Sequence, residues 1–222
     1  MSRGVKKTSP LWDARKAETE RKILDAATRL FLSDGYAATS LAAVAEAAEV
    51  GSRTVYLRFG TKAELLKRAI DVAIVGDTQD IDLAHRDWHL RAATAPTLEE
   101  RITAYAQGAA QLMARAAPLI AVATAAEPSE PLIAEAAQAG RAATQQHIAD
   151  IWRKMHADNL LHPEADLDWI ITTVGPLGQA DTYNLGVRTL GWTPATYEAW
   201  LHTTWLRMAT TPSTLPIRAP ER

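Results

Sequence analysis

The 222-residue sequence contains no cysteine, only two phenylalanines and no long uninterrupted hydrophobic run. Without thiols the chain has no disulfide framework, no cysteine nucleophile and no thiolate metal site. The most apolar stretch, residues 117–126, is too short to cross a bilayer, and no apolar segment follows the basic residues at the N-terminus. We therefore expect a soluble, cytoplasmic protein with no membrane partner.

Motifs for catalysis are also missing. The sequence has no serine elbow, phosphate-binding glycine loop, carboxylate pair or metalloprotease motif. His85 and His89 are four residues apart and suit metal ligation by spacing, but a polar helix face explains them better. We expect neither an enzyme nor a cofactor or metal site.

Charge is unevenly distributed along the chain. Residues 1–70 carry 13 Lys and Arg against 8 Asp and Glu, whereas residues 71–222 carry 11 against 18. A basic N-terminal part followed by an acidic C-terminal part favours a polyanionic partner for the N-terminal part alone. Chance asymmetry explains the same numbers equally well.

Apolar residues recur at helical spacing throughout, and no strand pattern occurs, so the predicted fold class is all-α. Thr61 to Glu64 has the spacing of a capping box, which marks the start of a helix. The predicted helices are 18–33, 41–49, 52–59, one from 62 on, 84–94, 98–126 with a break at Pro118, 130–158, 166–189 kinked or ended early at Pro176, and 194–210.

Turn-rich acidic residues near 76–82 mark the predicted domain boundary. The predicted organisation is a flexible basic arm (1–16), a helix-turn-helix domain with a three-helix bundle (17–76), a larger C-terminal helical domain (77–210) and a disordered tail (211–222).

The short helix 52–59 has an unusual outer face. At about 100° per residue, Val55 and Phe59 point the same way and are expected to face the core. The opposite side then carries Arg53 and Leu57, flanked by hydroxyls. An outward leucine beside arginine suits a DNA groove, where arginine binds a guanine edge and leucine contacts a thymine methyl. A connecting helix with a solvated face is the alternative.

The hydroxyl and basic groups around this helix suit DNA phosphates, as do the free N–H groups that begin the next helix. The predicted DNA-binding residues are Ser40, Gly51, Ser52, Arg53, Thr54, Tyr56, Leu57, Arg58 and Lys62.

Residues 18–72 resemble the TetR family of bacterial transcriptional regulators. The resemblance lies in ILDAATRLFLSDGYAATSLAAVAEAAEV followed by GSRTVYLRFGTKAELL. It implies a homodimer whose N-terminal domain binds a DNA operator and whose C-terminal domain binds a small-molecule effector and dimerises. Most members are repressors that the ligand releases from DNA.

At matching positions, Ser40, Thr54, Tyr56 and Lys62 correspond to DNA-backbone contacts, while Arg53 and Leu57 correspond to variable base contacts. The sequence departs from the family at four positions. Gly51 stands where a serine N-cap is usual and Glu49 where glycine is usual, and the other two departures are Ala43 and Gly60.

The segment 167–209 resembles the last two helices of many members, which pack against the partner subunit. Its large apolar residues suit either that interface or a core within one protomer. The predicted dimer contacts are Trp169, Leu177, Trp200 and Trp205.

Six of the seven tryptophans lie beyond residue 80, which suits a cavity for an apolar or aromatic ligand. For each residue an ordinary core position is the alternative. The predicted lining is Trp88, Met113, His147, Trp152, Met155, Trp169, Gln179 and Tyr183.

The sequence thus predicts a homodimeric DNA-binding regulator, a repressor released from a palindromic operator by an unidentified effector. An activator of the same fold is one alternative. A helical small-molecule-binding or catalytic protein with a structural N-terminal bundle is the other.

Overall fold

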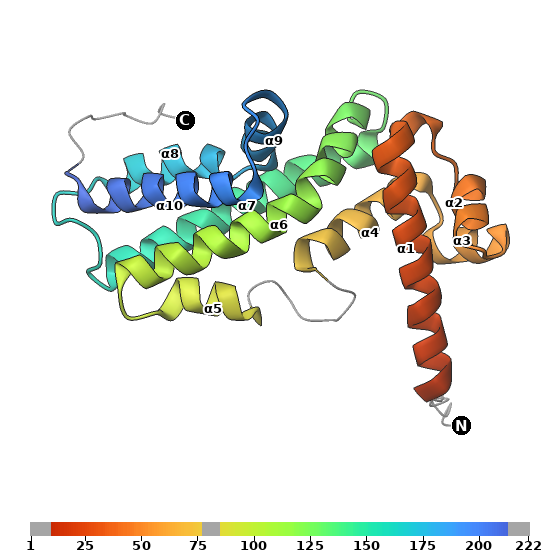
Figure 1. Cartoon of the computed structure of the whole chain (residues 1–222), viewed down its shortest axis with the longest axis horizontal. Coiled ribbons are helices and arrows are strands. Elements are labelled where there is room, and N and C mark those ends of the chain that lie inside the picture. The colour runs from red at the N-terminus through yellow and green to blue at the C-terminus, as the bar shows by residue number, and fades with distance from the viewer. Residues whose placement is uncertain (1–9, 77–84, 213–222) are drawn as a thin grey trace, which may run out of the picture.

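The computed structural model describes residues 10–76 and 85–212, and every regular element within them is a helix (Figure 1). The helices are α1 (Pro10–Ala38), α2 (Leu41–Ala47), α3 (Ser52–Phe59), α4 (Lys62–Val75), α5 (Asp87–Thr94), α6 (Leu98–Ala126), α7 (Pro131–Ala157), α8 (Leu167–Leu177), α9 (Ala180–Thr189) and α10 (Pro194–Thr210). The predicted all-α class is confirmed, and the predicted bounds of the helices at 52–59 and 194–210 match those of α3 and α10.

Local capping residues set several helix starts. The side chain of Ser40 accepts a hydrogen bond from the Ala43 N–H, and that of Thr61 accepts one from the Glu64 N–H. At α6, Thr97 and Glu100 form a complete capping box. Each contact satisfies an N–H group that has no partner inside its own helix.

Three predicted features differ from the structure. Helix α1 begins at Pro10, so residues 10–16 are helical and do not belong to an arm; residues 1–9, and 213–222 of the predicted tail, lie outside the described residues. Helix α6 continues through Pro118 without a break. The predicted helix 166–189 is two helices, because α8 ends just after Pro176 and Gly178 leads into α9.

Helix α6 is the central element, and α1, α4, α5, α7, α9 and α10 all pack on it. Contacts on all sides compensate for the hydrogen bond that Pro118 removes, which explains why the helix continues. By length and composition alone, α6 would also pass as a membrane span. Its packing against six other helices instead identifies it as the core helix of a bundle.

The C-terminal core is built around stacked aromatic rings. The Tyr105 ring of α6 stacks on Trp205 of α10 with a centroid distance of 4.1 Å, and Trp152 of α7 lies 5.2 Å from Trp205. Trp152 and Trp205 are both completely buried. These rings join α6, α7 and α10 in one core.

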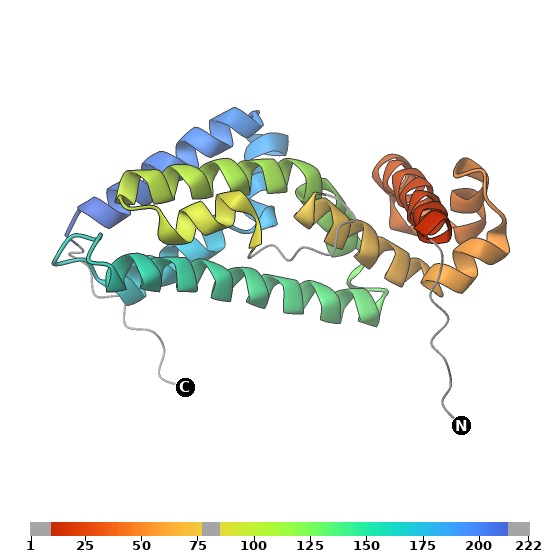
Figure 2. The ribbon, with the colours of Figure 1, turned by 90° about the horizontal axis from the view of Figure 1, so that it is seen from below.

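The N-terminal core extends beyond α1–α4. Leu119, Ala123 and Ala126 of α6 and Ile133 of α7 pack within it. Figure 2 shows α4 leading from the N-terminal helices to the place where α6 and α7 run side by side. The division of the chain near residue 76 stays a prediction, and the packing of the N-terminal helices depends on the longer helices beyond it.

Tyr36, just after the α1 kink at Gly35, links the two parts of the protein through Glu130 at the start of α7. Burial, the hydrogen bond to Glu130 and the negative charge of Glu130 raise the pKa of Tyr36 to about 12. The phenol is therefore neutral near pH 7 and donates to the carboxylate.

We expect Tyr36→Phe to lower the free energy of unfolding by about 1.5–3 kcal/mol at pH 8, because a hydrogen bond to a charged group is lost. The raised pKa stabilises the folded state fully below pH 10, and this stabilisation is lost as the pH rises through 12. The difference between wild type and variant should therefore shrink across that interval in urea titrations. A difference that is independent of pH would contradict the Tyr36–Glu130 contact.

Candidate nucleic-acid interface

A tight turn joins α2 to α3. The Val50 N–H donates to the Ala45 carbonyl at 3.0 Å, which closes the end of α2, and Glu49 adopts a left-handed conformation with φ 56°. This arrangement is a Schellman motif, in which glycine is the usual left-handed residue. The departure of Glu49 from the family pattern therefore falls at a position with real backbone strain.

Helix α3 has one buried and one open face. Val55 and Phe59 are buried, whereas the side chains of Tyr56 and Leu57 are 65% and 75% exposed. Figure 1 places α3 at the outer edge of the molecule, away from the C-terminal helices. A large aromatic and a large aliphatic side chain thus project from a surface that the rest of the described chain leaves open.

The polar residues of this face lie around the same helix start. Gly51, Ser52, Arg53 and Thr54 are all exposed, and Ser40 is exposed at the start of α2. Gly51 provides the N-cap of α3 with no side-chain hydrogen bond. The first N–H groups of α3 therefore face outward next to the Arg53 side chain.

Arg58 and Lys62 differ from the other predicted contacts because each is already bound within the protein. Arg58 pairs with Glu20 of α1. The ammonium group of Lys62 donates to the carbonyls of Tyr36 and Ala37 at 2.7 and 3.3 Å and lies 4.2 Å from the centre of the Tyr36 ring. Lys62 thus ties the start of α4 to the end of α1.

The C-terminal part contains a cavity of about 720 Å³ between α4, α6 and α7. Leu66, Ile70 and Ile74 of α4 form one wall, so a helix of the N-terminal core borders the cavity directly. The other lining residues are mostly alanine, leucine, isoleucine, methionine and aromatic side chains. A cavity of this size and polarity suits a small apolar molecule.

Half of the predicted pocket residues line this cavity. Trp88, Met113, His147 and Gln179 do so. Trp152, Met155, Trp169 and Tyr183 do not, and they pack in or against the C-terminal core instead. The indole ring of Trp88 packs directly against Gly108 of α6. A Cβ atom at Gly108 would lie 2.1 Å from this ring, so the glycine is what leaves room for it.

Trp205, predicted as a dimer contact, is completely buried by its own protomer, so that prediction is wrong for its side chain. Trp169, Leu177 and Trp200 are partly exposed, on α8 and α10. The rings of Tyr105 on α6 and Trp152 on α7 pack against Trp205, and the periodicity of α10 alone does not reveal this packing.

His89 is directed toward His147 across the gap between α5 and α7, with Nε2 to Nδ1 at 3.2 Å. It does not form the predicted shared polar face with His85. Among residues 10–76 and 85–212, no cluster of three metal-ligating side chains occurs.

The sequence interpretation missed two groups of residues. It did not include α4 in the cavity lining, although Leu66, Ile70 and Ile74 recur every four residues along one side of the helix. It also missed Glu20, whose role depends on arginines 38 and 48 residues away. No local pattern indicates that contact.

Residues 23–69 match the family model of bacterial regulatory proteins of the tetR family. No curated protein matches the sequence.

Solved structures share the whole fold. The fatty acid degradation regulator FadR from Bacillus halodurans has a TM-score of 0.64 at 15% identity, covering 90% of this chain and 97% of that one. NalD, the secondary repressor of the MexAB-OprM multidrug efflux pump in Pseudomonas aeruginosa, has a TM-score of 0.62 at 20% identity, covering 87% of this chain and 97% of that one. A putative TetR-family transcriptional regulator from Rhodococcus sp. has a TM-score of 0.63 at 15% identity, covering 86% of this chain and 98% of that one.

At these identities the structural likeness establishes the fold, and the family match adds the identity of the N-terminal helices. Together with the open face of α3, they show a helix-turn-helix domain on a larger helical body. Residues 23–69 therefore belong to the tetR family of bacterial regulatory proteins, and the chain as a whole has the fold of the solved TetR-family regulators, with an N-terminal helix-turn-helix domain and a larger C-terminal helical domain.

Proposed function

We propose that the protein is a transcriptional repressor that binds a palindromic operator as a homodimer and leaves it when a small apolar molecule occupies the cavity. In this proposal α3 enters the major groove, Arg53 and Leu57 contact bases, and Ser40, Thr54 and Tyr56 contact phosphates. The protein acts in the cytoplasm. Neighbours of the same fold include NalD, which is described as a repressor.

The observation that carries the proposal is the uncovered outer face of α3. Leu57, at 75% exposed, is the most exposed of the large hydrophobic side chains described, and Arg53 lies one helical turn before it. Water is a poor environment for such a leucine, whereas the methyl groups of thymine bases provide apolar contact.

The proposed dimer brings together the surfaces of α8, α9 and α10. Leu185 and Leu190 are more than half exposed, and Trp169 and Trp200 are partly exposed on the neighbouring helices. Apolar side chains of this size are common in homodimer interfaces. Two copies of α3 would then read half-sites about 34–36 Å apart, one turn of the double helix.

The proposed effector acts through α4, because this helix borders the cavity and also forms part of the N-terminal core. Arg115 of α6 donates to the carbonyls of Ala73 and Ile74 at the end of α4, so the position of α4 is linked to the central helix. An occupant that favours one position of α4 over another would shift the population of DNA-binding dimers.

Fragments of host genomic DNA bound by the wild-type protein provide the operator for the test. On that duplex we expect Arg53→Ala to weaken binding by about 1–2 kcal/mol and to relax selection at one base pair in each half-site. Tyr56→Ala should weaken binding to all duplexes alike, because it removes a phosphate contact. Fluorescence anisotropy over a series of salt concentrations measures both effects.

Arg153→Ala is the matched control for lost positive charge, because Arg153 is exposed near the end of α7 and pairs only with Asp150. Its operator affinity should equal that of wild type. Equal affinities for wild type, Arg53→Ala and Tyr56→Ala would refute the role of α3. A reporter promoter overlapping the selected site should be less active when the protein is present, and higher activity would identify an activator.

A further inference from the structure

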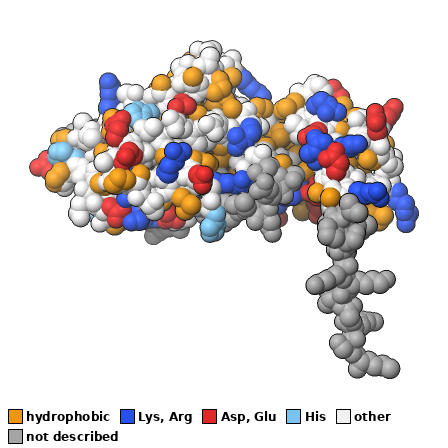
Figure 3. Space-filling view, turned by 60° about the horizontal axis from the view of Figure 1, so that its bottom comes forward, with side chains coloured by type: hydrophobic (Ala, Val, Ile, Leu, Met, Phe, Trp, Pro, Cys, Tyr) orange, Lys and Arg blue, Asp and Glu red, His pale blue; other side chains and the backbone are white. Residues whose placement is uncertain are grey.

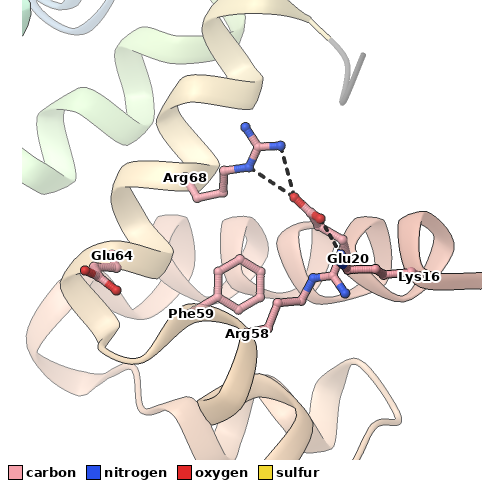
Figure 4. A pocket seen from close by; sticks show the side chains of 6 residues that line it. All are labelled: Lys16, Glu20, Arg58, Phe59, Glu64 and Arg68. Atoms are coloured by element: carbon pink, nitrogen blue, oxygen red, sulfur yellow. Dashed lines mark hydrogen bonds and ion pairs between the residues drawn. The ribbon is translucent and has the colours of Figure 1, made fainter. Parts of the chain in front are cut away.

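The carboxylate of Glu20 joins three helices of the N-terminal domain (Figure 4). One oxygen accepts a hydrogen bond from the guanidinium of Arg58 on α3 at 2.5 Å. The other accepts a hydrogen bond from Nε of Arg68 on α4 at 3.1 Å and forms an ion pair with Nη2 of the same side chain at 3.0 Å. A single side chain of α1 thus binds the proposed DNA-reading helix and the helix that borders the cavity.

This ion-pair network is shielded from solvent, unlike the surface pairs along α1. The side chains of Glu20 and Arg58 are only 19% and 18% exposed, whereas Arg21 and Glu18 are at least half exposed. Burial raises the pKa of Glu20, but the hydrogen bonds from Arg58 and Arg68 outweigh it, so the pKa is lowered overall. Glu20 is therefore ionised at neutral pH, with both of its oxygens bound.

Helix α3 has few other anchors. It spans only eight residues, and Val55 and Phe59, one helical turn apart, are its only buried side chains. Two contacts along one line leave the helix able to rock about that line. The Arg58–Glu20 contact lies to one side of it, next to Phe59 in Figure 4, and supplies the lateral restraint.

From this geometry we infer that Glu20 is a positioning residue for sequence recognition. It fixes the orientation of α3 through Arg58, and it keeps the charge of Arg58 from adding to non-specific phosphate binding. The inference rests on the proposed DNA-binding function. It reverses the expectation that Arg58 contacts phosphate, because a guanidinium held by a shielded carboxylate restrains the helix instead.

The test compares Glu20→Gln with Glu18→Gln. Both variants remove one negative charge from α1, but Glu18 binds only Arg21, on its own helix. Affinities are measured by anisotropy for the duplex selected by wild type and for a scrambled duplex of equal length and composition, at a temperature where thermal melts show all variants folded.

We expect Glu20→Gln to bind the selected duplex about tenfold more weakly, because a loosened α3 loses its aligned base contacts. The scrambled duplex should bind equally well, or up to about threefold more tightly, because the released Arg58 attracts phosphate. The ratio of the two affinities should fall for Glu20→Gln and stay at the wild-type value for Glu18→Gln.

Arg58→Gln provides the independent readout. If Arg58 restrains α3, this variant lowers the affinity ratio as Glu20→Gln does. If Arg58 contacts phosphate, both duplexes bind more weakly by one factor and the salt slope falls by about 1. The second result overturns the inference, as does an unchanged ratio for Glu20→Gln. A wild-type protein with no preference for any duplex would instead refute the proposed function.

Discussion

Replacing Trp205 with alanine is expected to lower the free energy of unfolding by about 3–5 kcal/mol, the usual cost of removing a large buried aromatic side chain. The indole is completely buried between the rings of Tyr105 and Trp152, with centroid distances of 4.1 and 5.2 Å. Alanine would leave a void between α6, α7 and α10 that rigid helices cannot close. Urea unfolding followed by circular dichroism measures the loss.

Trp200→Ala is the matched control, one helical turn and one residue away on α10. The Trp200 side chain is partly exposed, with its ring 5.2 Å from Trp192 and 5.9 Å from Tyr197. Its replacement should cost about 1–2 kcal/mol, because less apolar area is lost. Both variants are compared at one protein concentration, since the stability of a dimer depends on concentration. Equal losses would contradict the different positions of the two rings.

The N-terminal helices were predictable because their signals are local. Ser40 and Thr61 mark helix starts, Gly60 follows the last residue of α3, and Val55 and Phe59 are one turn apart. Each feature depends on neighbours within four residues. The orientation of α3, with Leu57 outward, follows from this spacing alone.

The C-terminal helices show where local signals end. Trp152 and Trp205 lie in the core while Trp88 lines the cavity, although all three occupy apolar faces of helices. Periodicity shows that a face is apolar, but not whether its own core, a cavity or a second subunit covers it. Pro118 was misread for a related reason, because contacts from other helices hold α6 together across it.

Arg53 and Arg58 show within one helix that a local pattern does not reveal what a side chain contacts. Both are basic residues of α3, and the sequence assigned both to DNA. Arg53 is exposed, whereas Glu20, 38 residues upstream, binds Arg58. Figure 3 shows acidic and basic side chains intermixed over one face of the protein, so net charge alone does not separate free from paired cations.

The second large effect is expected on ligand binding, when a larger side chain on α7 fills part of the cavity. Ile133, Ala137, Gly140, Thr144 and His147 line it at alternating spacings of four and three residues, which places them on one face of the helix. A Cβ atom at Gly140 would have nothing within 4 Å. Gly140 is exposed and lines the cavity, so a larger side chain at this position has room to extend over it.

We expect Gly140→Phe to weaken binding of the neutral aromatic probe N-phenyl-1-naphthylamine by about 100-fold. The new phenyl ring would take the place of one aromatic group of the probe, and the burial of a group of that size contributes about 2–3 kcal/mol. Probe fluorescence measures the dissociation constant directly. Gly140→Ala is the control. It adds one methyl group, leaves most of the cavity open, and should bind the probe within about threefold of wild type.

The stability of the two variants distinguishes a filled cavity from a damaged fold. Alanine in place of a glycine inside a helix should raise the free energy of unfolding by about 0.5–1 kcal/mol. Phenylalanine should raise it too, because the ring packs against apolar walls that are otherwise uncovered. Probe affinity and stability then change in opposite directions in Gly140→Phe, whereas a distorted variant loses both. Undiminished probe binding in a stable Gly140→Phe would place the probe outside this cavity.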